Sequence, residues 1–420
     1  MPNLVSSTLL SSNLISSKLL TSSPTRRGLL ASAAVLGVST AAAAQTANEP
    51  IEGKQGGTIL GPRNPAREAE NPQALQPPPT DHGGLPNLRF TFADAHMKMR
   101  EGGWSREVTQ RELPIATTMA GVNMRLTPGG TRELHWHKQA EWSFMLAGQA
   151  RITAVDNDGH NFIADVNAGD LWYFPSGIPH SIQGLGQDGC EFLLAFPDGQ
   201  FSEDSTFAIT DLFAHMPKDA LAKNLGVDQK ALDHIPSGEK FIFKVPLPPP
   251  LQADTVGSGV GAVPLDMAFH MMAQKADQFP GGSVRIADTR NFAVSSDVAA
   301  ALVEVNPGHM REVHWHPNAD EWQYYIAGKA RMTVFAAQGN ARTFDYQAGD
   351  VGYVPKSMPH FVENTGTEPL RFLELFNAPR FVDVSLTQWM ALTPHELVAA
   401  HLDIDKSVID ALPKDKRPIV

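Results

Sequence analysis

The chain repeats itself, and this repeat limits what it can fold into more than any other feature. The string Arg-Glu-Leu-His-Trp-His at residues 132–137 returns as Arg-Glu-Val-His-Trp-His at residues 311–316. Later landmarks recur in the same order, including the Pro-His pairs that end at His180 and His360. The offset is about 180 residues throughout, which is the length expected of a domain rather than of a short solenoid repeat. The sequence therefore predicts two copies of one fold.

Each copy has the pattern of short strands joined by turns. Residues 150–155, 171–174 and 192–196 are rich in aromatic and β-branched side chains and are bounded by Gly, Pro, Asn or Asp. Regular short strands of this kind indicate a sandwich or a barrel. Helical spacing of Leu, Ala and Val occurs only near residues 217–235 and 385–412. We expect an all-β fold, with a small helical appendage after each barrel.

The first 44 residues predict an export signal. Residues 1–27 carry Lys18, Arg26 and Arg27 and no acidic side chain, and a short run rich in Gly and Ala follows up to Gln45. Paired arginines before a weak apolar run are typical of twin-arginine export. The run is short and weakly apolar for a membrane-spanning helix. We expect a periplasmic or extracellular protein with no stable membrane association after signal removal.

Composition predicts the remaining organisation. Residues 45–86 are rich in Pro, Gly, Asn and Gln and lack apolar periodicity, so we interpret them as a linker or extended arm. The first copy is then assigned to residues 87–240 and the second to residues 241–420. The formal net charge is −11 and the sequence has no block rich in Lys and Arg, which argues against a nucleic-acid partner.

Histidines and carboxylates are the metal ligands that this chain can offer. The single cysteine, Cys190, excludes an intrachain disulfide and a cysteine-based zinc cluster. Both His-x-His pairs place their imidazoles on one side of a strand, because alternate residues share a face. A Glu follows each pair, and a third His follows each Glu by 39 residues. The predicted ligands are His135, His137, Glu141 and His180 in the first copy, and His314, His316, Glu321 and His360 in the second.

This ligand set predicts two metal sites with open coordination positions. Three imidazoles and one carboxylate leave one or two positions free on an octahedral ion, which suits Mn(II) or Fe(II) better than a closed structural zinc. The alternative is a set of partly buried strand histidines at chance spacing. Recurrence of four positions in order in two copies argues against chance.

The spacings around these ligands resemble those of the cupin superfamily. Residues 129–148 follow its first motif, Gly-x5-His-x-His-x3-Glu-x6-Gly, and residues 308–328 follow the variant with four residues before Glu. Residues 169–180 and 349–360 match its second motif, with Ser357 in place of a glycine. The chain thus resembles a bicupin, which implies two double-stranded β-helix, or jelly-roll, barrels.

Beyond the ligands, the chain resembles the oxalate decarboxylases from about residue 86 to its C-terminus. The strings that carry the resemblance lie at residues 132–137, 170–177 and 321–326. The resemblance implies cleavage of oxalate to formate and carbon dioxide, with two Mn(II) per chain and dioxygen as a co-catalyst. It also implies a homo-oligomer, either a trimer or a hexamer.

Two arginines are predicted to bind the substrate. Arg132 and Arg311 each precede the first metal ligand of their copy by three residues. A guanidinium is always charged and can hold a carboxylate through two hydrogen bonds. The alternative is a solvated surface arginine, which duplication beside both metal sites disfavours.

The resemblance assigns further roles in a polar loop and in the second copy. It matches Glu203 to the glutamate of a lid over the first metal, which acts as proton donor and acceptor, and it assigns Thr206 to substrate binding. The family's lid has Asn where Asp204 stands. Glu363, three residues beyond a metal ligand, is interpreted as the corresponding catalytic acid of the second site.

We therefore predict a manganese-dependent oxalate decarboxylase whose first copy is the catalytic centre, because only that copy has the lid sequence. One alternative is an oxalate oxidase or another iron or manganese dioxygenase on the same scaffold. The other is a non-enzymatic storage or metal-binding bicupin. Eight intact ligand positions argue against the second alternative.

Overall fold

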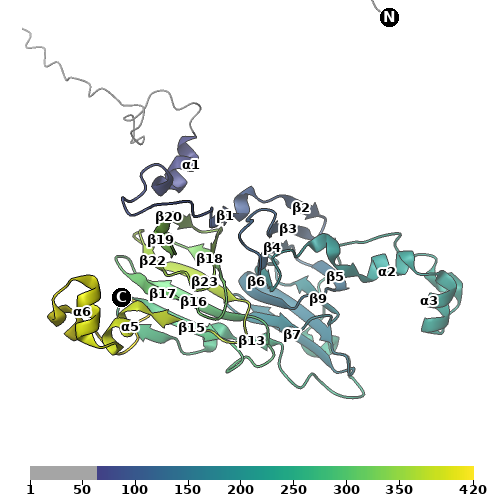
Figure 1. Ribbon diagram of the computed structural model, residues 1–420. Helices are drawn as coiled ribbons and strands as arrows, with labels where there is room; N and C mark the ends of the chain where they lie inside the picture. The colour runs from purple at the N-terminus through teal and green to yellow at the C-terminus, as the bar shows by residue number, and fades with distance from the viewer. Residues whose placement is uncertain (1–63) are drawn as a thin grey trace, which may run out of the picture. The chain divides into compact units, whose positions relative to one another are not determined.

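The computed structural model describes residues 64–420, and two β-barrels account for most of this part (Figure 1). The predicted all-β fold of two barrels with small helical appendages is confirmed. The predicted export signal, residues 1–44, and the first part of the predicted linker, residues 45–63, lie outside the described residues.

The first barrel is a set of antiparallel strands wrapped around the long strand β6. The first half of β6 pairs with β8 and β10, and its second half pairs with β7 and β9. The single strand β6 therefore belongs to both sheets of the barrel. The strands are β2 (Met97–Arg100), β3 (Gly103–Val108), β4 (Ala120–Leu126), β5 (Gly130–Trp136), β6 (Glu141–Val155), β7 (Asn161–Asn167), β8 (Leu171–Phe174), β9 (His180–Gly184), β10 (Cys190–Phe196) and β11 (Phe207–Ala208).

The second barrel repeats this plan with a seven-stranded and a five-stranded sheet. Here β18 and β19 take the place of the single strand β6. The strands are β14 (Asp277–Phe279), β15 (Gly282–Ala287), β16 (Ala299–Val305), β17 (Met310–Trp315), β18 (Glu321–Ala327), β19 (Lys329–Ala336), β20 (Asn340–Gln347), β21 (Asp350–Val354), β22 (His360–Asn364), β23 (Leu370–Phe376) and β24 (Val384–Ser385).

Glycine is required where the chain passes from one sheet to the other. Gly148 has a φ of 76°, and a Cβ there would lie 2.0 Å from the Gly189 carbonyl oxygen. Gly328 stands at the same place in the second barrel, with a φ of 86°. Only glycine tolerates both this backbone conformation and so close an approach. The last glycine of the first cupin motif is thus explained by barrel geometry.

Segments that lie outside the barrel strands cross between the two copies. Strand β1 (Arg89–Thr91) pairs with β21 of the second barrel. In return, β12 (Ile242–Lys244) pairs with β5, and β13 (Ala268–Phe269) pairs with β8 of the first barrel. Strand pairing therefore crosses the boundary predicted between residues 240 and 241. Each crossing segment covers a strand edge that would otherwise expose its unpaired amides and carbonyls.

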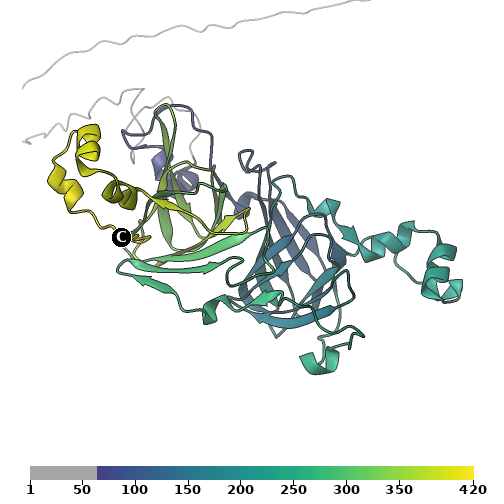
Figure 2. The same ribbon diagram turned by 60° about the horizontal axis from the view of Figure 1, so that its bottom comes forward.

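One large apolar cluster spans the two barrels, and further residues of the second barrel form a separate core. Trp142 and Trp172 of the first barrel belong to the same buried cluster as Trp322 and Leu373 of the second. Polar contacts also join the barrels, since the Thr118 hydroxyl donates to Asp320 over 2.9 Å. Figure 2 shows the sheets of the two barrels packed side by side.

Short helices follow each barrel, as the sequence predicted, and two further ones lie in the predicted linker and near the start of the second copy. They are α1 (Pro65–Glu70), α2 (Ile209–His215), α3 (Lys218–Leu225), α4 (Leu251–Asp254), α5 (Leu386–Leu392), α6 (His395–Leu402) and α7 (Lys406–Asp410). The 3-10 turns are η1 (Pro72–Ala74), η2 (Phe92–Asp94), η3 (Glu203–Ser205), η4 (Gln229–Leu232) and η5 (Met271–Ala273). Among residues 64–420, no helix has the length and apolar character needed to cross a bilayer.

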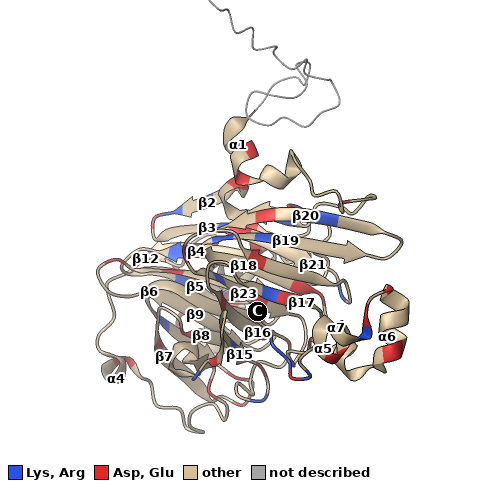
Figure 3. Ribbon diagram, turned by 90° about the vertical axis from the view of Figure 1, so that its left-hand side faces the viewer, with Lys and Arg blue, Asp and Glu red and all other residues tan. Residues whose placement is uncertain are grey.

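Basic and acidic residues alternate over the ribbon (Figure 3). In the described part, Lys and Arg do not gather on one element, and ion pairs such as Arg151 with Asp165 and Arg89 with Asp350 join many of them to acids.

Candidate metal centres

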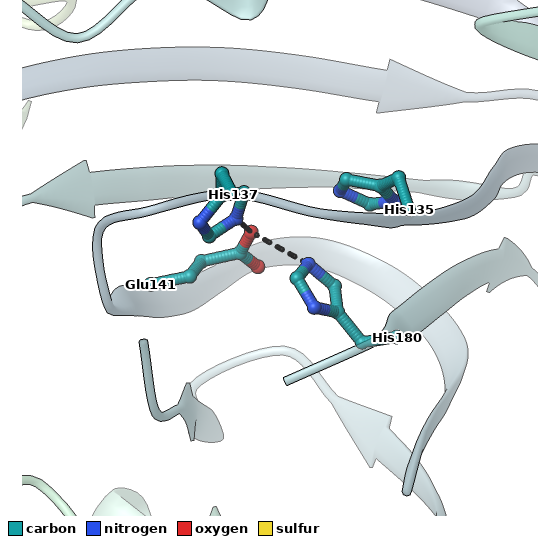
Figure 4. A group of neighbouring side chains, drawn as sticks. All are labelled: His135, His137, Glu141 and His180. Atoms are coloured by element: carbon teal, nitrogen blue, oxygen red, sulfur yellow. Dashed lines mark hydrogen bonds and ion pairs between the residues drawn. The ribbon is translucent and has the colours of Figure 1, made fainter. Parts of the chain in front are cut away.

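The first group of predicted ligands meets inside the first barrel. His135 and His137 lie at the end of β5, while Glu141 and His180 begin β6 and β9. Their ligand atoms lie within 4.8 Å of one another, and all four residues are buried. Figure 4 shows the four side chains turned toward a common point. The structure thus brings together four residues from three strands.

The second group has the same construction. His314 lies on β17 and His316 just after it, while Glu321 and His360 begin β18 and β22. These ligand atoms also lie within 4.8 Å of one another in a buried position. All eight predicted ligand positions therefore occur in two matching groups.

The hydrogen bonds of the six imidazoles leave the Nε2 atom of each neutral ring without a proton. The Nδ1 atom of every ligand histidine lies 2.6–3.1 Å from a backbone carbonyl oxygen. A carbonyl oxygen only accepts, so each Nδ1–H is the donor, and a neutral ring then carries a lone pair at Nε2. Orientation of a ligand imidazole by such a carbonyl is the usual arrangement in metal sites.

These lone pairs converge with a carboxylate oxygen, which fits a divalent cation. The Nε2 atoms of His316 and His360 lie 3.1 and 2.8 Å from Glu321 Oε2, and these three buried atoms have no hydrogen bond to any residue in the described range 64–420. In the first group, the Nε2 atoms of His137 and His180 lie 3.2 and 3.3 Å from Glu141 Oε2. Acceptors at these distances repel one another unless a cation lies among them. The donor set suits a first-row metal ion.

The protonation states agree with metal binding. Burial, with the nearby arginine of each copy, holds the pKa of His135 and His314 well below 6.5, so these rings are neutral. Burial opposes ionisation of Glu141 and Glu321, but positive charge on the facing histidines, whose place a bound cation would take, lowers the pKa of both. Neutral imidazole and ionised carboxylate are the forms that bind metal.

Arg132 is a buried residue at the first centre, not a surface arginine. Only 1% of it is exposed, and its NH2 atom donates to Glu203 Oε2 over 3.1 Å. Its NH1 atom donates to the Phe241 carbonyl oxygen, and its guanidinium lies 4.4 Å from the Phe241 ring centre. The structure thus places the predicted substrate-binding residue against the predicted lid glutamate.

A β-bulge explains why Arg132 and His135 both face the interior. Residues three apart on a regular strand point to opposite sides. The pairing of β5 with β9 shifts register between Arg132 and His135, and the pairing of β17 with β22 shifts between Arg311 and His314. Such a shift inserts an extra residue and re-aims the side chains that follow. The same irregularity therefore positions the arginine in both copies.

Arg311 is hydrogen-bonded to two carboxylates, whereas Arg132 is hydrogen-bonded to Glu203 alone and lies 3.8 Å from Glu239. The Nε of Arg311 lies 3.2 Å from Glu374 Oε1, and its NH2 lies 2.7 Å from Asp383 Oδ2. Burial raises the pKa of Glu374 above its ordinary value. Burial opposes ionisation of Asp383 too, but Arg311 and Lys416 lower its pKa to about 2. The second arginine is already neutralised within the protein.

The structure does not place Glu363 at the second centre, so that prediction is wrong. Glu363 lies on β22 three residues after His360, and β22 pairs with β19 without a register shift between them. Its side chain therefore points away from the ligands, is 42% exposed, and lies 3.7 Å from Arg331.

The buried acid of the second centre is Glu374, which motif reasoning missed. It lies on β23 within the string Leu-Arg-Phe-Leu-Glu-Leu-Phe, and the equivalent residue of the first barrel is Leu194. A lone carboxylate among apolar strand residues was the available signal, because buried acids need a partner. Its partner here is Arg311.

The predicted substrate-binding residue Thr206 ends the lid. It follows η3 and precedes β11, which pairs with β5 beside His135. Its hydroxyl is buried and, within the described residues, has no hydrogen-bond partner. The structure thus leaves this hydroxyl free to bind another group, and its assignment stays a prediction.

Comparison with known proteins gives one family. The cupin family matches residues 92–233 and 271–410. The chain is 55% identical over 372 residues to the oxalate decarboxylase OxdC of Bacillus subtilis, which covers 89% of this chain and 96% of the relative. It is 40% identical over 380 residues to a probable oxalate decarboxylase of Arthroderma benhamiae, covering 89% of this chain and 93% of the relative.

Solved structures agree with these relatives. A Bacillus subtilis oxalate decarboxylase structure, from work on its Mn(II) centres, is 54% identical with a TM-score of 0.86, covering 89% of this chain and 99% of that one. Another structure of that enzyme, at pH 4.6, is 55% identical with a TM-score of 0.86, covering 90% of this chain and 98% of that one. The chain belongs to the cupin family and, within it, to the bicupin oxalate decarboxylases.

Proposed function

We propose that the protein decarboxylates oxalate to formate and carbon dioxide at its first metal centre, with Mn(II) in both centres. The observation that carries this proposal is the placement of Arg132 and Glu203 against one another in the buried space beside His135. A cation for a carboxylate, a group that moves protons and an open metal position are the three requirements for cleaving this small dicarboxylate. The similarity to the Bacillus enzyme supports the same substrate.

The bound metal would be held by His135, His137, Glu141 and His180, and would supply a Lewis acid and, with dioxygen, one-electron chemistry. The chain's own residues do the rest. Arg132 binds the carboxylate of oxalate that lies away from the metal, in place of Glu203. Buried walls exclude water and so strengthen this charge interaction.

Glu203 moves the proton. It takes the proton of hydrogen oxalate, the C–C bond breaks with release of carbon dioxide, and Glu203 returns the proton to the carbon that remains. The new C–H bond gives formate, and the overall reaction involves no net oxidation. A lid residue can make both transfers because it closes over the reacting carbon and remains there between them.

The second centre is proposed to hold metal without binding oxalate. Arg311 already contacts two carboxylates, Glu374 and Asp383. Oxalate would have to displace one of these two carboxylates from a buried position. Breaking a buried ion pair in this way costs about 3–5 kcal/mol. The first arginine is hydrogen-bonded to one carboxylate, that of Glu203 on the lid, which can move, and its other acidic neighbour, Glu239, lies 3.8 Å away.

One assay tests the proposed function. Purified protein is incubated with oxalate in air, and formate, carbon dioxide, peroxide and metal content are measured on the same sample. Equal amounts of formate and carbon dioxide with bound Mn are expected. Peroxide with little formate would identify an oxidase instead, and absence of turnover by metal-loaded protein would identify a binding or storage bicupin.

We further propose a homo-oligomer, a trimer or a hexamer. Large apolar side chains are exposed on the appendage that follows each barrel, among them Met216 and Leu225 on the first and Trp389 and Leu392 on the second. Exposed apolar residues gathered on small helices support burial against another subunit. Light scattering on the purified protein checks the mass, and a monomer would refute the proposal.

We propose export through the twin-arginine route, with residues 1–44 removed. The paired Arg26 and Arg27 before an apolar run support it. Export after folding would allow metal loading before transport. Mass spectrometry of the exported protein measures the cleavage position, and Arg26→Lys with Arg27→Lys should retain the protein inside the cell.

A further inference from the structure

Neighbouring residues of the lid point to opposite sides. We define the lid as residues 202–206. Glu203 is 3% exposed and points inward to Arg132, whereas the side chain of Asp204 is 76% exposed and points outward. The outward carboxylate lies 2.9 Å from Lys98 Nζ. Each lid acid is therefore paired with a cation of the barrel, one on each side.

Lys98 is well placed to hold the lid from outside. It lies on the edge strand β2, its side chain is 21% exposed, and its Nζ lies 3.9 Å from the centre of the Phe241 ring. The guanidinium of Arg132 contacts the same ring. A cation that packs on an aromatic ring is held in position and loses less freedom when it pairs with an acid. Phe241 thus links the two cations that bind the two lid acids.

The barrel also contacts the lid backbone. The Glu203 amide donates to Glu107 Oε1 over 3.2 Å. The cavity outside the lid has a volume of about 630 Å³ and is lined by Lys98, Glu107, Arg111 and Asp204, among others. Water and salt therefore reach the Lys98–Asp204 pair from this cavity, while the Arg132–Glu203 pair stays buried.

We infer that Lys98 and Asp204 form a latch, a pair of positioning residues that keeps Glu203 over the first metal centre. This inference rests on the proposed function for its kinetic consequences. Neither residue touches the substrate. The latch stabilises the closed lid whether or not oxalate is bound, so its loss lowers the fraction of bound enzyme that is closed. The expected signature is a lower kcat without a higher KM.

Three variants test the latch: Lys98→Met, Asp204→Asn and the double variant. Loss of an exposed ion pair of this kind should lower kcat by about two- to fivefold. Because both single variants break the same contact, each should show the same loss, and the double variant should be no worse than either. Lys98→Arg keeps the charge and should retain most of the activity. Lys218→Met is the matched control, because it breaks a 2.8 Å pair with Asp233 on the first appendage.

Hydrogen exchange gives a readout that needs no turnover. The amides of residues 203–205 should exchange faster in both single variants than in the unaltered protein and in Lys218→Met. High salt should accelerate exchange of these amides in the unaltered protein, since salt screens an accessible pair, and should have little effect in Asp204→Asn.

The outcomes separate the latch from the proposed function. If the unaltered protein makes no formate, the proposed function fails, and exchange of the lid amides still decides on the latch. If it makes formate but the variants match it in kcat and in exchange, the latch is overturned. Losses that add in the double variant also overturn the latch, because they mean that Lys98 and Asp204 have separate roles. A higher KM at unchanged kcat overturns it too, because it means that the altered residue contacts the substrate.

Discussion

Glu203 Oε2 lies 3.1 Å from Arg132 NH2, and both side chains are buried beside the first metal centre. Glu203, the proposed proton carrier, is thus bound to the guanidinium of Arg132, the proposed substrate-binding group. Oxalate has to replace the glutamate on the guanidinium, so binding and lid movement are linked. The second centre lacks this arrangement, because Arg311 keeps two carboxylate partners from the barrel and the C-terminal segments around it.

Glu203→Ala should retain Mn and lose most formate production. The substitution removes the proton carrier without touching a metal ligand, and loss of a general acid and base costs about 10²–10⁴-fold in rate. Glu203→Gln is the shape-matched control, since it can still contact Arg132 but cannot take a proton. Formate yield and metal content are measured together, and full formate production by either variant would remove the lid glutamate from the mechanism.

Arg132→Gln should weaken oxalate binding. A hydrogen bond to a charged group contributes about 1.5–3 kcal/mol, so kcat/KM should fall by about 10- to 100-fold. Arg132→Lys should retain only part of the kcat/KM of the unaltered protein, because an ammonium cannot hold a carboxylate through two parallel hydrogen bonds. Steady-state kinetics with oxalate gives both values, and an unchanged kcat/KM in Arg132→Gln would contradict the assignment.

Glu374→Leu should destabilise the second barrel. The change introduces the residue that the first barrel carries at the equivalent position, Leu194, but it leaves the buried guanidinium of Arg311 with one carboxylate fewer. Removing one partner of a buried pair costs about 3–5 kcal/mol. Thermal unfolding measures the change. Glu363→Leu, at the exposed acid of β22, should change the midpoint little, and equal losses in the two variants would contradict the difference in burial.

Glu107 should make stability depend on pH. Burial and the neighbouring Glu203 raise the pKa of Glu107 to about 7, from an ordinary value of 4.5. Between these values the folded protein binds more protons than the unfolded chain, so the free energy of unfolding falls as the pH rises through this window. Glu107→Gln should flatten that fall and raise the melting temperature at pH 7.5 by about 2–4 °C relative to the unaltered protein.

The control for this pH dependence is Glu101→Gln, at an exposed position in the turn between β2 and β3. It should leave the pH profile of the melting temperature unchanged. A profile for Glu107→Gln that runs parallel to that of the unaltered protein from pH 4.5 to 7 would show that Glu107 does not titrate in this range.

Metal removal should lower stability at both centres. Without a cation, the Nε2 lone pairs of His316 and His360 face Glu321 Oε2 at 3.1 and 2.8 Å. A cation that binds only the folded state stabilises it by mass action, about 2.7 kcal/mol at a free concentration 100 times its Kd. Chelation should therefore lower the melting temperature, and added Mn(II) should restore it. A midpoint that does not change with metal content would contradict the ligand assignment.

The repeat and the local spacings were sufficient to predict the barrels and the eight ligand positions. Periodicity of two decides which strand residues share a face, so the spacing of the His-x-His pairs is enough to place their imidazoles together. The same rule places Glu363 on the face opposite His360, because the two residues are three apart on a regular strand, so the assignment taken from the family resemblance was wrong. The rule does not hold for Arg132, also three residues from a ligand, because a β-bulge shifts the register before His135.

Other features depend on contacts between distant segments. Glu374 and Arg311 are 63 residues apart, and Lys98 and Asp204 are 106 apart, so no local pattern predicts that they pair. The crossing of β1 and β12 between barrels has the same origin. The sequence by itself determined which residues can bind metal, because ligand chemistry and strand periodicity are local properties. The tertiary structure decided which acid faces which arginine, because register, bulges and the packing of remote strands set those distances.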